Sequence, residues 1–296
     1  MPELPDVTVY VEALERAVQG RTLNGVRLAS PFLLRTADPP LAELSGREVV
    51  GLRRLGKRIV FELSDDLFLV LHLMIAGRLK WKDEPGAAIP GKVGLAAFDF
   101  SSGTLLLTEA SSKKRASLHV VRGEAGLNAH RRGGLEVLGA DLESFARVLR
   151  SENHPLKRTL TDPRLFSGIG NAYSDEILFE AGLSPMKLSQ KLDDEEVRRL
   201  WEATNAVLER FTAAIRAEAG DGFPAKVTAF RPDMNVHGRY REPCRACGSK
   251  IMRVAFADNE LNYCPRCQNE GRLLADRSLS KLMKKDWPKR IEDLEK

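Results

Sequence analysis

Long apolar runs and a secretory leader are both missing from the sequence. None of its 296 residues belongs to a run approaching the roughly 18 apolar positions of a membrane span. The N-terminus lacks the basic, apolar and small-residue order of a signal peptide. We therefore expect a cytoplasmic protein with no membrane partner. No internal repeat is present.

Cysteine is scarce, and all four cysteines lie close together. A Cys-x-x-Cys pair at Cys244 and Cys247 is followed, after sixteen residues, by a second pair at Cys264 and Cys267. In a reducing compartment this clustering favours metal over disulfides. Two such pairs, with a β-hairpin between them, bring four thiolates into a tetrahedron around Zn²⁺. We expect one structural zinc that the ribbon needs for folding, and a redox or disulfide pair is the alternative.

Length and charge allow several domains and an anionic partner. The chain is long enough for two ordinary domains and a small module. Its net charge is +5 and its pI is about 9.0, which makes a polyanion plausible. Basic residues surround the cysteines, and they suit either a phosphate backbone or a solvated surface. They are Arg239, Arg241, Arg245, Lys250, Arg253 and Arg266.

Apolar periodicity divides the chain into a β-rich and a helical part. Residues 5–20 have helical spacing, and period-two segments from 26 to 121, with SDD and SSG as turns, predict an antiparallel sandwich or barrel. After HRRGG at 130–134, helical patterns begin at 141. The fold class is therefore α+β.

A glycine-rich turn lies inside the helical part, in FSGIGNAYSDEILFEAG. Gly168 and Gly170 permit a tight turn, Asn171 stands at the expected helix N-cap, and Gly182 ends the helix. Such a turn directs backbone N–H groups and the Asn amide outward, as phosphate binding requires. An ordinary helix–helix turn is the alternative.

Several motifs occur together and in a fixed order. They are MPELP, the lysine of RRLGKRIVFEL, LHLMIAG, GIGNAYSDEILFEAG, VHGR and the CxxC ribbon ending in CQ. Together they resemble the formamidopyrimidine-DNA glycosylase and endonuclease VIII family over almost the whole chain. The opening MPELP is closer to the formamidopyrimidine branch.

The resemblance implies an organisation in three domains. We expect an N-terminal β-sandwich with a leading helix at 1–130, a helix-two-turn-helix domain at 131–236 and a zinc finger at 237–270. A basic tail at 271–296 goes beyond the family pattern. The implied partner is damaged double-stranded DNA, bound by a monomer.

The resemblance also implies base-excision DNA repair by a bifunctional glycosylase and lyase. After removal of Met1, the Pro2 amine would attack the sugar C1′ of a flipped nucleotide, expel the base and permit β- and δ-elimination. Glu3 would act as general acid at the ring oxygen. The helix N-terminus and a nearby lysine should lower the pKa of the amine.

Further residues match the family's DNA contacts. Lys57 matches its DNA-contacting lysine, with a solvated turn lysine as the alternative. Asn171 matches its phosphate-binding asparagine. Tyr173 and Glu176 match the pattern after that asparagine, although Glu176 suits a structural cap equally well. His72 precedes the loop near the lesion.

The chain departs from the family where the gap left by the flipped base is filled. The void-filling methionine falls on Ile75, with Met74 at a position usually occupied by glycine. The Arg-Phe block is replaced by EASSKKRAS, in which Lys113, Lys114 and Arg115 keep positive charge without an aromatic ring.

Three further departures concern the zinc ribbon, the lesion and the first helix. Asn259 replaces an arginine that would bind phosphate as a fork, which an amide cannot do. The segment from 222 to 237 is short for a loop that caps an oxidised purine. Asp6 stands where glutamate is usual. Lesion identity is therefore less defined than chemistry.

Two other functions are compatible with parts of the sequence. A damage- or abasic-site-binding protein of the same fold, with weak or lost excision, would fit the altered block and Asn259. An RNA-binding protein would fit the ribbon alone. Retention of Pro2, Glu3 and Lys57 favours the enzyme, because binding alone needs no proline amine.

Overall fold

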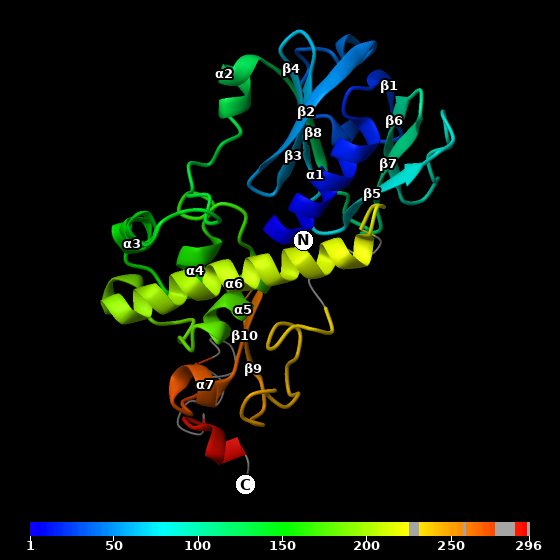
Figure 1. The fold of residues 1–296 in the computed structure, drawn as a ribbon. Helices are drawn as coiled ribbons and strands as arrows, with labels where there is room; N and C mark the ends of the chain where they lie inside the picture. Colours follow the sequence, from blue (N-terminus) through cyan, green and yellow to red (C-terminus); the bar gives the residue numbers. More distant parts are fainter. Residues whose placement is uncertain (225–230, 257–258, 276–287, 295–296) are drawn as a thin grey trace. The chain divides into compact units, whose positions relative to one another are not determined.

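The computed structural model describes residues 1–224, 231–256, 259–275 and 288–294. The chain divides into two compact units, Met1–Arg132 with Phe211–Thr228, and Gly133–Arg210 with Ala229–Lys296. The helices are α1 Leu4–Val18, α2 Gly123–Asn128, α3 Leu142–Ser151, α4 Leu156–Thr161, α5 Asn171–Glu180, α6 Asp194–Ala219 and α7 Pro265–Asn269 (Figure 1). No helix in the described part of the chain combines the length and apolarity needed to cross a membrane.

An antiparallel sheet of eight strands, in the order β5-β7-β6-β1-β2-β3-β4-β8, builds the first unit. The strands are β1 Thr22–Leu28, β2 Arg47–Leu55, β3 Arg58–Leu63, β4 Leu67–His72, β5 Gly77–Lys82, β6 Gly94–Phe100, β7 Gly103–Glu109 and β8 Ser117–Arg122. The turn after β3 places Asp65 and Asp66 at φ 61° and 57°, a conformation that aspartate tolerates.

The two halves of this sheet face each other across one core. Phe61 of β3 stacks on Phe98 of β6 at a centroid distance of 6.2 Å. Helix α1 contributes Val7, Tyr10 and Leu14 to the same cluster. The apolar stripe of α1 therefore fixes the start of the chain against the sheet, as Figure 1 shows.

The second unit is helical and carries a small hairpin. Asp141 caps α3 by accepting from the Ser144 N–H at 2.7 Å. Strands β9 Met252–Ala255 and β10 Glu260–Tyr263 pair antiparallel between the two cysteine pairs. The expected α+β class, with an N-terminal antiparallel sheet, a helical region and a four-cysteine ribbon, is confirmed.

Two local expectations need revision. Helix α5 begins at Asn171, and its N-cap is Gly170, which has the extended φ of −128° and ψ of −158°. Asn171 is therefore the first helical residue rather than the cap, because glycine takes the extended cap conformation at little cost. Helix α2 was not expected, since GEAGLN carries no clear amphipathic pattern.

Candidate active site and nucleic-acid interface

The start of α1 holds Glu3 in a fixed position. Glu3 is only 2% exposed, and its backbone N–H donates to Asp6 Oδ2 at 2.8 Å. Its carbonyl accepts from the Val7 N–H at 2.9 Å. Asp6 therefore satisfies an N–H group that the helix leaves without a partner. The shorter side chain at position 6 is compatible with capping.

The amino terminus has a shifted pKa. Burial lowers the pKa of the Met1 amino group below its usual value. The positive charges of Arg78 and Lys57 lower this pKa further, whereas the carboxylates of Glu3 and Asp6 raise it. The first residues thus lie within electrostatic reach of two cations and two carboxylates, and the nearby cations favour a neutral amine.

Lys57 lies in the tight turn between β2 and β3. Gly56 has a φ of +60°, which glycine adopts without strain. Arg54 Nη1 donates to the Gly56 carbonyl at 2.9 Å. The turn sets Lys57 where its charge acts on both the amino terminus and His72. The predicted association of Pro2, Glu3 and Lys57 is compatible with this arrangement.

His72 ends β4 within electrostatic reach of Lys57 and Arg58. Burial lowers its pKa to about 4, and the charges of Arg58 and Lys57 act in the same direction. Its Nδ1 accepts a hydrogen bond from the Met74 backbone N–H at 3.2 Å. The imidazole is therefore neutral at pH 7, with Nε2 carrying a proton that can be donated.

A tight turn after His72 presents the apolar pair. Met74 has a φ of 52°, and the Ile75 side chain is 54% exposed. The Gly77 N–H donates to the Leu73 carbonyl at 2.9 Å, and a Cβ at Gly77 would lie 2.2 Å from that oxygen. Only glycine permits this closure. The exposed apolar tip is thus Ile75.

A buried carboxylate that the sequence did not single out organises the basic loop at 110–116. Glu109 is 1% exposed, and its Oε2 accepts from the backbone N–H groups of Arg115 and Ala116 at 2.9 and 3.1 Å. The Lys114 ammonium bonds to the Glu109 carbonyl. Lys113, Lys114 and Arg115 themselves are exposed. Glu109 was missed because one glutamate at a strand end has no sequence signature.

A cleft of about 720 Å³ lies in the first unit beside Arg78. It is lined by residues of α1 and β5 and by residues 221–224. Trp81 stacks on Phe223 at a centroid distance of 6.4 Å and an interplanar angle of 7°. This stacking fixes the segment that follows α6 against β5.

In the second unit, the N-terminus of α5 presents Asn171. Lys157 Nζ and Ser174 Oγ donate to the Asn171 carbonyl, at 2.5 and 3.2 Å. Within the described residues the Asn171 side-chain amide makes no hydrogen bond, so the amide remains available to a ligand. Tyr173, two residues on, is 1% exposed and belongs to the core.

Two adjacent buried carboxylates follow on α5. Glu176 accepts from the backbone N–H groups of Asn235, Val236 and His237 at 2.7 to 2.9 Å. Burial raises the pKa of Glu176, and these three donors lower it. Asp175 binds side chains of other segments. Glu176 matches the family pattern, with a structural cap or ion-pair partner as the equal alternative, and its hydrogen bonds hold the backbone at the start of the VHGR segment.

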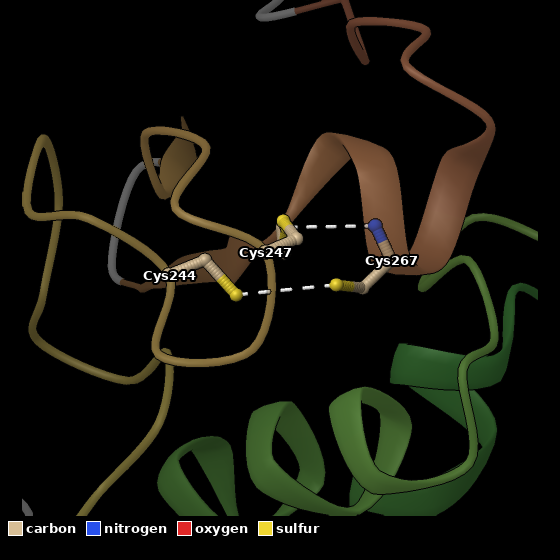
Figure 2. A group of neighbouring side chains, drawn as sticks. Cys244, Cys247 and Cys267 are labelled. Carbon is tan, nitrogen blue, oxygen red and sulfur yellow. Dashed lines mark hydrogen bonds between the residues drawn. The ribbon is translucent and has the colours of Figure 1, made fainter.

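The four cysteines converge on one point, as Figure 2 shows for three of them. Their sulfur atoms all lie within 4.8 Å of one another. The Cys244 and Cys267 sulfurs are 3.9 Å apart, and those of Cys247 and Cys264 are 3.4 Å apart. Zinc–sulfur bonds of about 2.3 Å in a tetrahedron place sulfurs about 3.8 Å apart.

The chemistry of the four thiols also fits zinc. Burial raises the pKa of the Cys264 thiol to about 11, so four thiolates require a cation to hold them together. Elsewhere in the described chain, no group of histidines, cysteines and carboxylates is arranged to hold a metal. The cluster is a zinc finger, consistent with one structural Zn²⁺.

Asn259 lies at the turn of the β9–β10 hairpin. Its carbonyl accepts from the Phe256 N–H at 2.8 Å, and the Phe256 ring is 44% exposed. On β9, Arg253 lies over the Tyr240 ring at 4.5 Å and pairs with Glu260 at 3.2 Å. The hairpin thus carries the guanidinium of Arg253 on β9, whereas Asn259, which replaces the family's arginine, precedes β10.

Comparison with known families matches three segments of the chain. Residues 1–115 match the formamidopyrimidine-DNA glycosylase N-terminal domain. Residues 137–221 match the H2TH domain of the same enzymes. Residues 241–269 match a zinc finger found in FPG and IleRS. Residues 270–296 lie beyond these matches.

Individual relatives cover nearly the whole chain. The formamidopyrimidine-DNA glycosylase of Heliobacterium modesticaldum is 33% identical over 90% of this chain and 100% of its own. The crystal structure of MutM (Fpg) from Thermus thermophilus is 32% identical, with a TM-score of 0.75, over 91% of this chain and all of that one.

A third similar structure is MutM in complex with carbocyclic 8-oxo-G containing DNA, which is 25% identical with a TM-score of 0.77 over 90% of this chain and 100% of that one. The agreement of three successive domains and of relatives matched along their full length establishes the family. The chain belongs to the formamidopyrimidine-DNA glycosylase family, whose members are bifunctional glycosylases and abasic-site lyases.

Proposed function

We propose that this protein is a base-excision repair enzyme that removes damaged bases from double-stranded DNA and cuts the strand at abasic sites. The proposal is carried by the surroundings of the amino terminus, where Glu3 is buried and the charges of Lys57 and Arg78 lie within electrostatic reach of the amine. A protein that only binds DNA would not need a buried carboxylate and two cations around its amino terminus.

The chemistry assigned to the first residues is nucleophilic. Once Met1 is removed, the Pro2 nitrogen attacks C1′, the bond from C1′ to the base breaks, and the departing base takes up the proton that the Pro2 nitrogen loses. Glu3 gives a proton to the ring oxygen as the C1′–O4′ bond opens and the iminium forms. Loss of a C2′ proton then expels the 3′ phosphate, a second elimination expels the 5′ phosphate, and hydrolysis frees Pro2.

Several side chains are assigned to DNA. Lys57 lies next to the amine and pairs with a phosphate near the lesion, and the neutral His72 donates a hydrogen bond to the same backbone. Asn171 binds a second phosphate through its amide and the start of α5. The pair of Met74 and Ile75 enters the gap left by the flipped base.

The remaining contacts come from the loop at 110–116 and from the ribbon. Lys113, Lys114 and Arg115 supply positive charge beside the gap, and the Asn259 turn approaches the backbone with Arg253 nearby. A damage-binding protein with weak excision is the second candidate, because Asn259 and the loop both lack the family's arginine.

A duplex with a single abasic site, treated with borohydride, tests the proposal. We expect the mature protein to cut the strand and to form a covalent adduct. An N-terminal extension that blocks the amine is the control, and it should abolish both. Undiminished trapping by the extended protein would remove Pro2 from the mechanism, and tight binding without cleavage or adduct would favour the second candidate.

A further inference from the structure

Asp175 is a buried carboxylate that binds three other segments of the second unit. It lies on α5 and is 1% exposed. Its oxygens accept from Lys157 on α4, from His237 in the VHGR segment and from Asn262 on β10. A carboxylate removed from water needs such donors, so its binding partners must stay in place.

One oxygen of Asp175 faces the turn that carries Asn171. Lys157 Nζ lies 2.7 Å from Asp175 Oδ1, and it also donates to the Asn171 carbonyl at 2.5 Å. The Lys157 side chain is 12% exposed. The ammonium therefore joins the first residue of α5 to a residue one turn later, and this fixes how Asn171 faces outward.

The other oxygen of Asp175 faces the zinc ribbon. Asp175 Oδ2 lies 2.7 Å from His237 Nδ1 and 3.1 Å from the backbone nitrogen of Asn262. Asn262 belongs to β10, which follows the Asn259 turn and precedes Cys264. Figure 1 shows β10 beside α5. The hairpin is thus attached to α5 by a hydrogen bond from its own backbone.

We propose that Asp175 is a positioning residue that holds the Asn171 turn and the zinc hairpin in one arrangement for binding DNA. The inference rests on the proposed function. Sequence reasoning did not find it, because the three partners lie 18, 62 and 87 residues away along the chain.

Charge and positioning predict opposite effects of an Asp175→Asn substitution on DNA binding. Replacing an aspartate by asparagine removes a negative charge, and electrostatics predicts tighter binding to a polyanion. If Asp175 acts by positioning, the same change weakens binding, because the amide cannot accept from all of its donors. The direction of the effect therefore separates the two roles.

The test measures binding of the zinc-loaded, full-length protein to an abasic-site duplex. For Asp175→Asn we expect about tenfold weaker binding, with one zinc retained and a trapping rate at saturating DNA within about twofold of the wild type. Glu180→Gln removes an exposed carboxylate from the same helix, and it should bind as tightly as the wild type or more tightly.

A double-variant cycle with Asn171→Ala shows whether Asp175 affects DNA binding through Asn171. In that background Asp175→Asn should cost clearly less than tenfold, because one of the two elements that it positions, the Asn171 turn, has already lost its phosphate contact. Unchanged or tighter binding by Asp175→Asn would overturn the proposal, and so would a tenfold loss that persists in the Asn171→Ala background. A wild type that neither binds nor traps would instead overturn the proposed function.

A second variant covers the case in which Asp175→Asn loses its zinc. His237→Phe keeps an aromatic ring and removes one donor to Asp175. We expect about threefold to tenfold weaker binding with zinc retained. Binding by this variant equal to that of the wild type would overturn the proposal.

Discussion

At the scale of single residues, the proposed chemistry lies where buried and charged groups meet. The capped start of α1 holds the amine and Glu3 in place, and the turn at Gly56 holds Lys57 where its charge acts on the amine. His72 extends it, with a ring that stays neutral near pH 7 because burial opposes its protonation.

The lowered pKa of His72 makes stability depend on pH. Between about pH 6.5 and 4 the unfolded chain binds a proton at this residue that the folded chain does not, so stability falls as the pH falls through this window. His119, whose pKa burial also lowers to about 4, contributes in the same direction. Below about pH 4 both states are protonated and this contribution stops changing.

Replacing the histidine should therefore reduce the pH dependence. We expect urea unfolding between pH 7 and 5 to show a smaller loss of unfolding free energy in His72→Asn than in the wild type. Equal losses in the two proteins would mean that His72 titrates normally in the folded state.

The sequence predicts sites at residues that belong to a motif, and it missed the buried carboxylates that belong to none. Pro2, Glu3 and the cysteines belong to short patterns, whose local spacing already brings the groups together. The role of Asp175 depends on partners that only the tertiary fold brings to it. Glu109 is a single glutamate at the end of a strand, and no local pattern marks it. The cap position of Asn171 was wrong because Gly170 serves better as a cap.

At the scale of elements, the loop at 110–116 depends on Glu109. Glu109→Ala should leave the buried Ala116 N–H and the part-buried Arg115 N–H without their acceptor, at a cost of about 1–3 kcal/mol for the buried one. We expect lower thermal stability and weaker binding to an abasic-site duplex. Glu109→Gln keeps one acceptor oxygen and should lie closer to the wild type.

The effect on binding should act through the loop itself. In a Lys113→Ser and Arg115→Ser background, Glu109→Ala should weaken binding little further. If Glu109→Ala weakened binding equally in both backgrounds, Glu109 would act elsewhere than through this loop.

The zinc ribbon and the eight-stranded sheet should respond differently to loss of the metal. Their cores are separate, and only the ribbon depends on zinc. Cys264→Ser should lose the metal and bind DNA at least about tenfold more weakly, while the thermal transition of the first unit remains. Elemental analysis that finds no zinc in the wild type, or unchanged DNA affinity of the variant, would contradict this expectation.

The elements themselves were largely predictable from the sequence. The segments on either side of the SDD and SSG turns correspond to strands β3, β4, β6 and β7. Because these strands are buried along most of their length, each leaves a short apolar run bounded by turn residues in the sequence. The order of strands in the sheet, and the pairing of β4 with β8, leave no such trace, since they depend on contacts distant in the chain.

At the scale of the whole molecule, the proposed function makes substrate choice depend on what fills the gap after a base is flipped. Unstacking costs a few kcal/mol, and a loop without an aromatic ring recovers less of that cost. We expect faster excision or cleavage at abasic sites, ring-opened purines and saturated or oxidised pyrimidines than at 8-oxoguanine opposite cytosine. Equal single-turnover rates on matched duplexes would show that Ile75 and the basic loop replace the missing block fully.

Mapping the trapped adduct tests the central assignment most directly. The mature protein is reacted with abasic-site DNA and borohydride, digested with trypsin and analysed by mass spectrometry. The modification is expected on the peptide of residues 2–16, at the nitrogen of Pro2. An adduct on the side chain of Lys57, with residues 2–16 unmodified, would contradict the assignment of the amino terminus as the nucleophile.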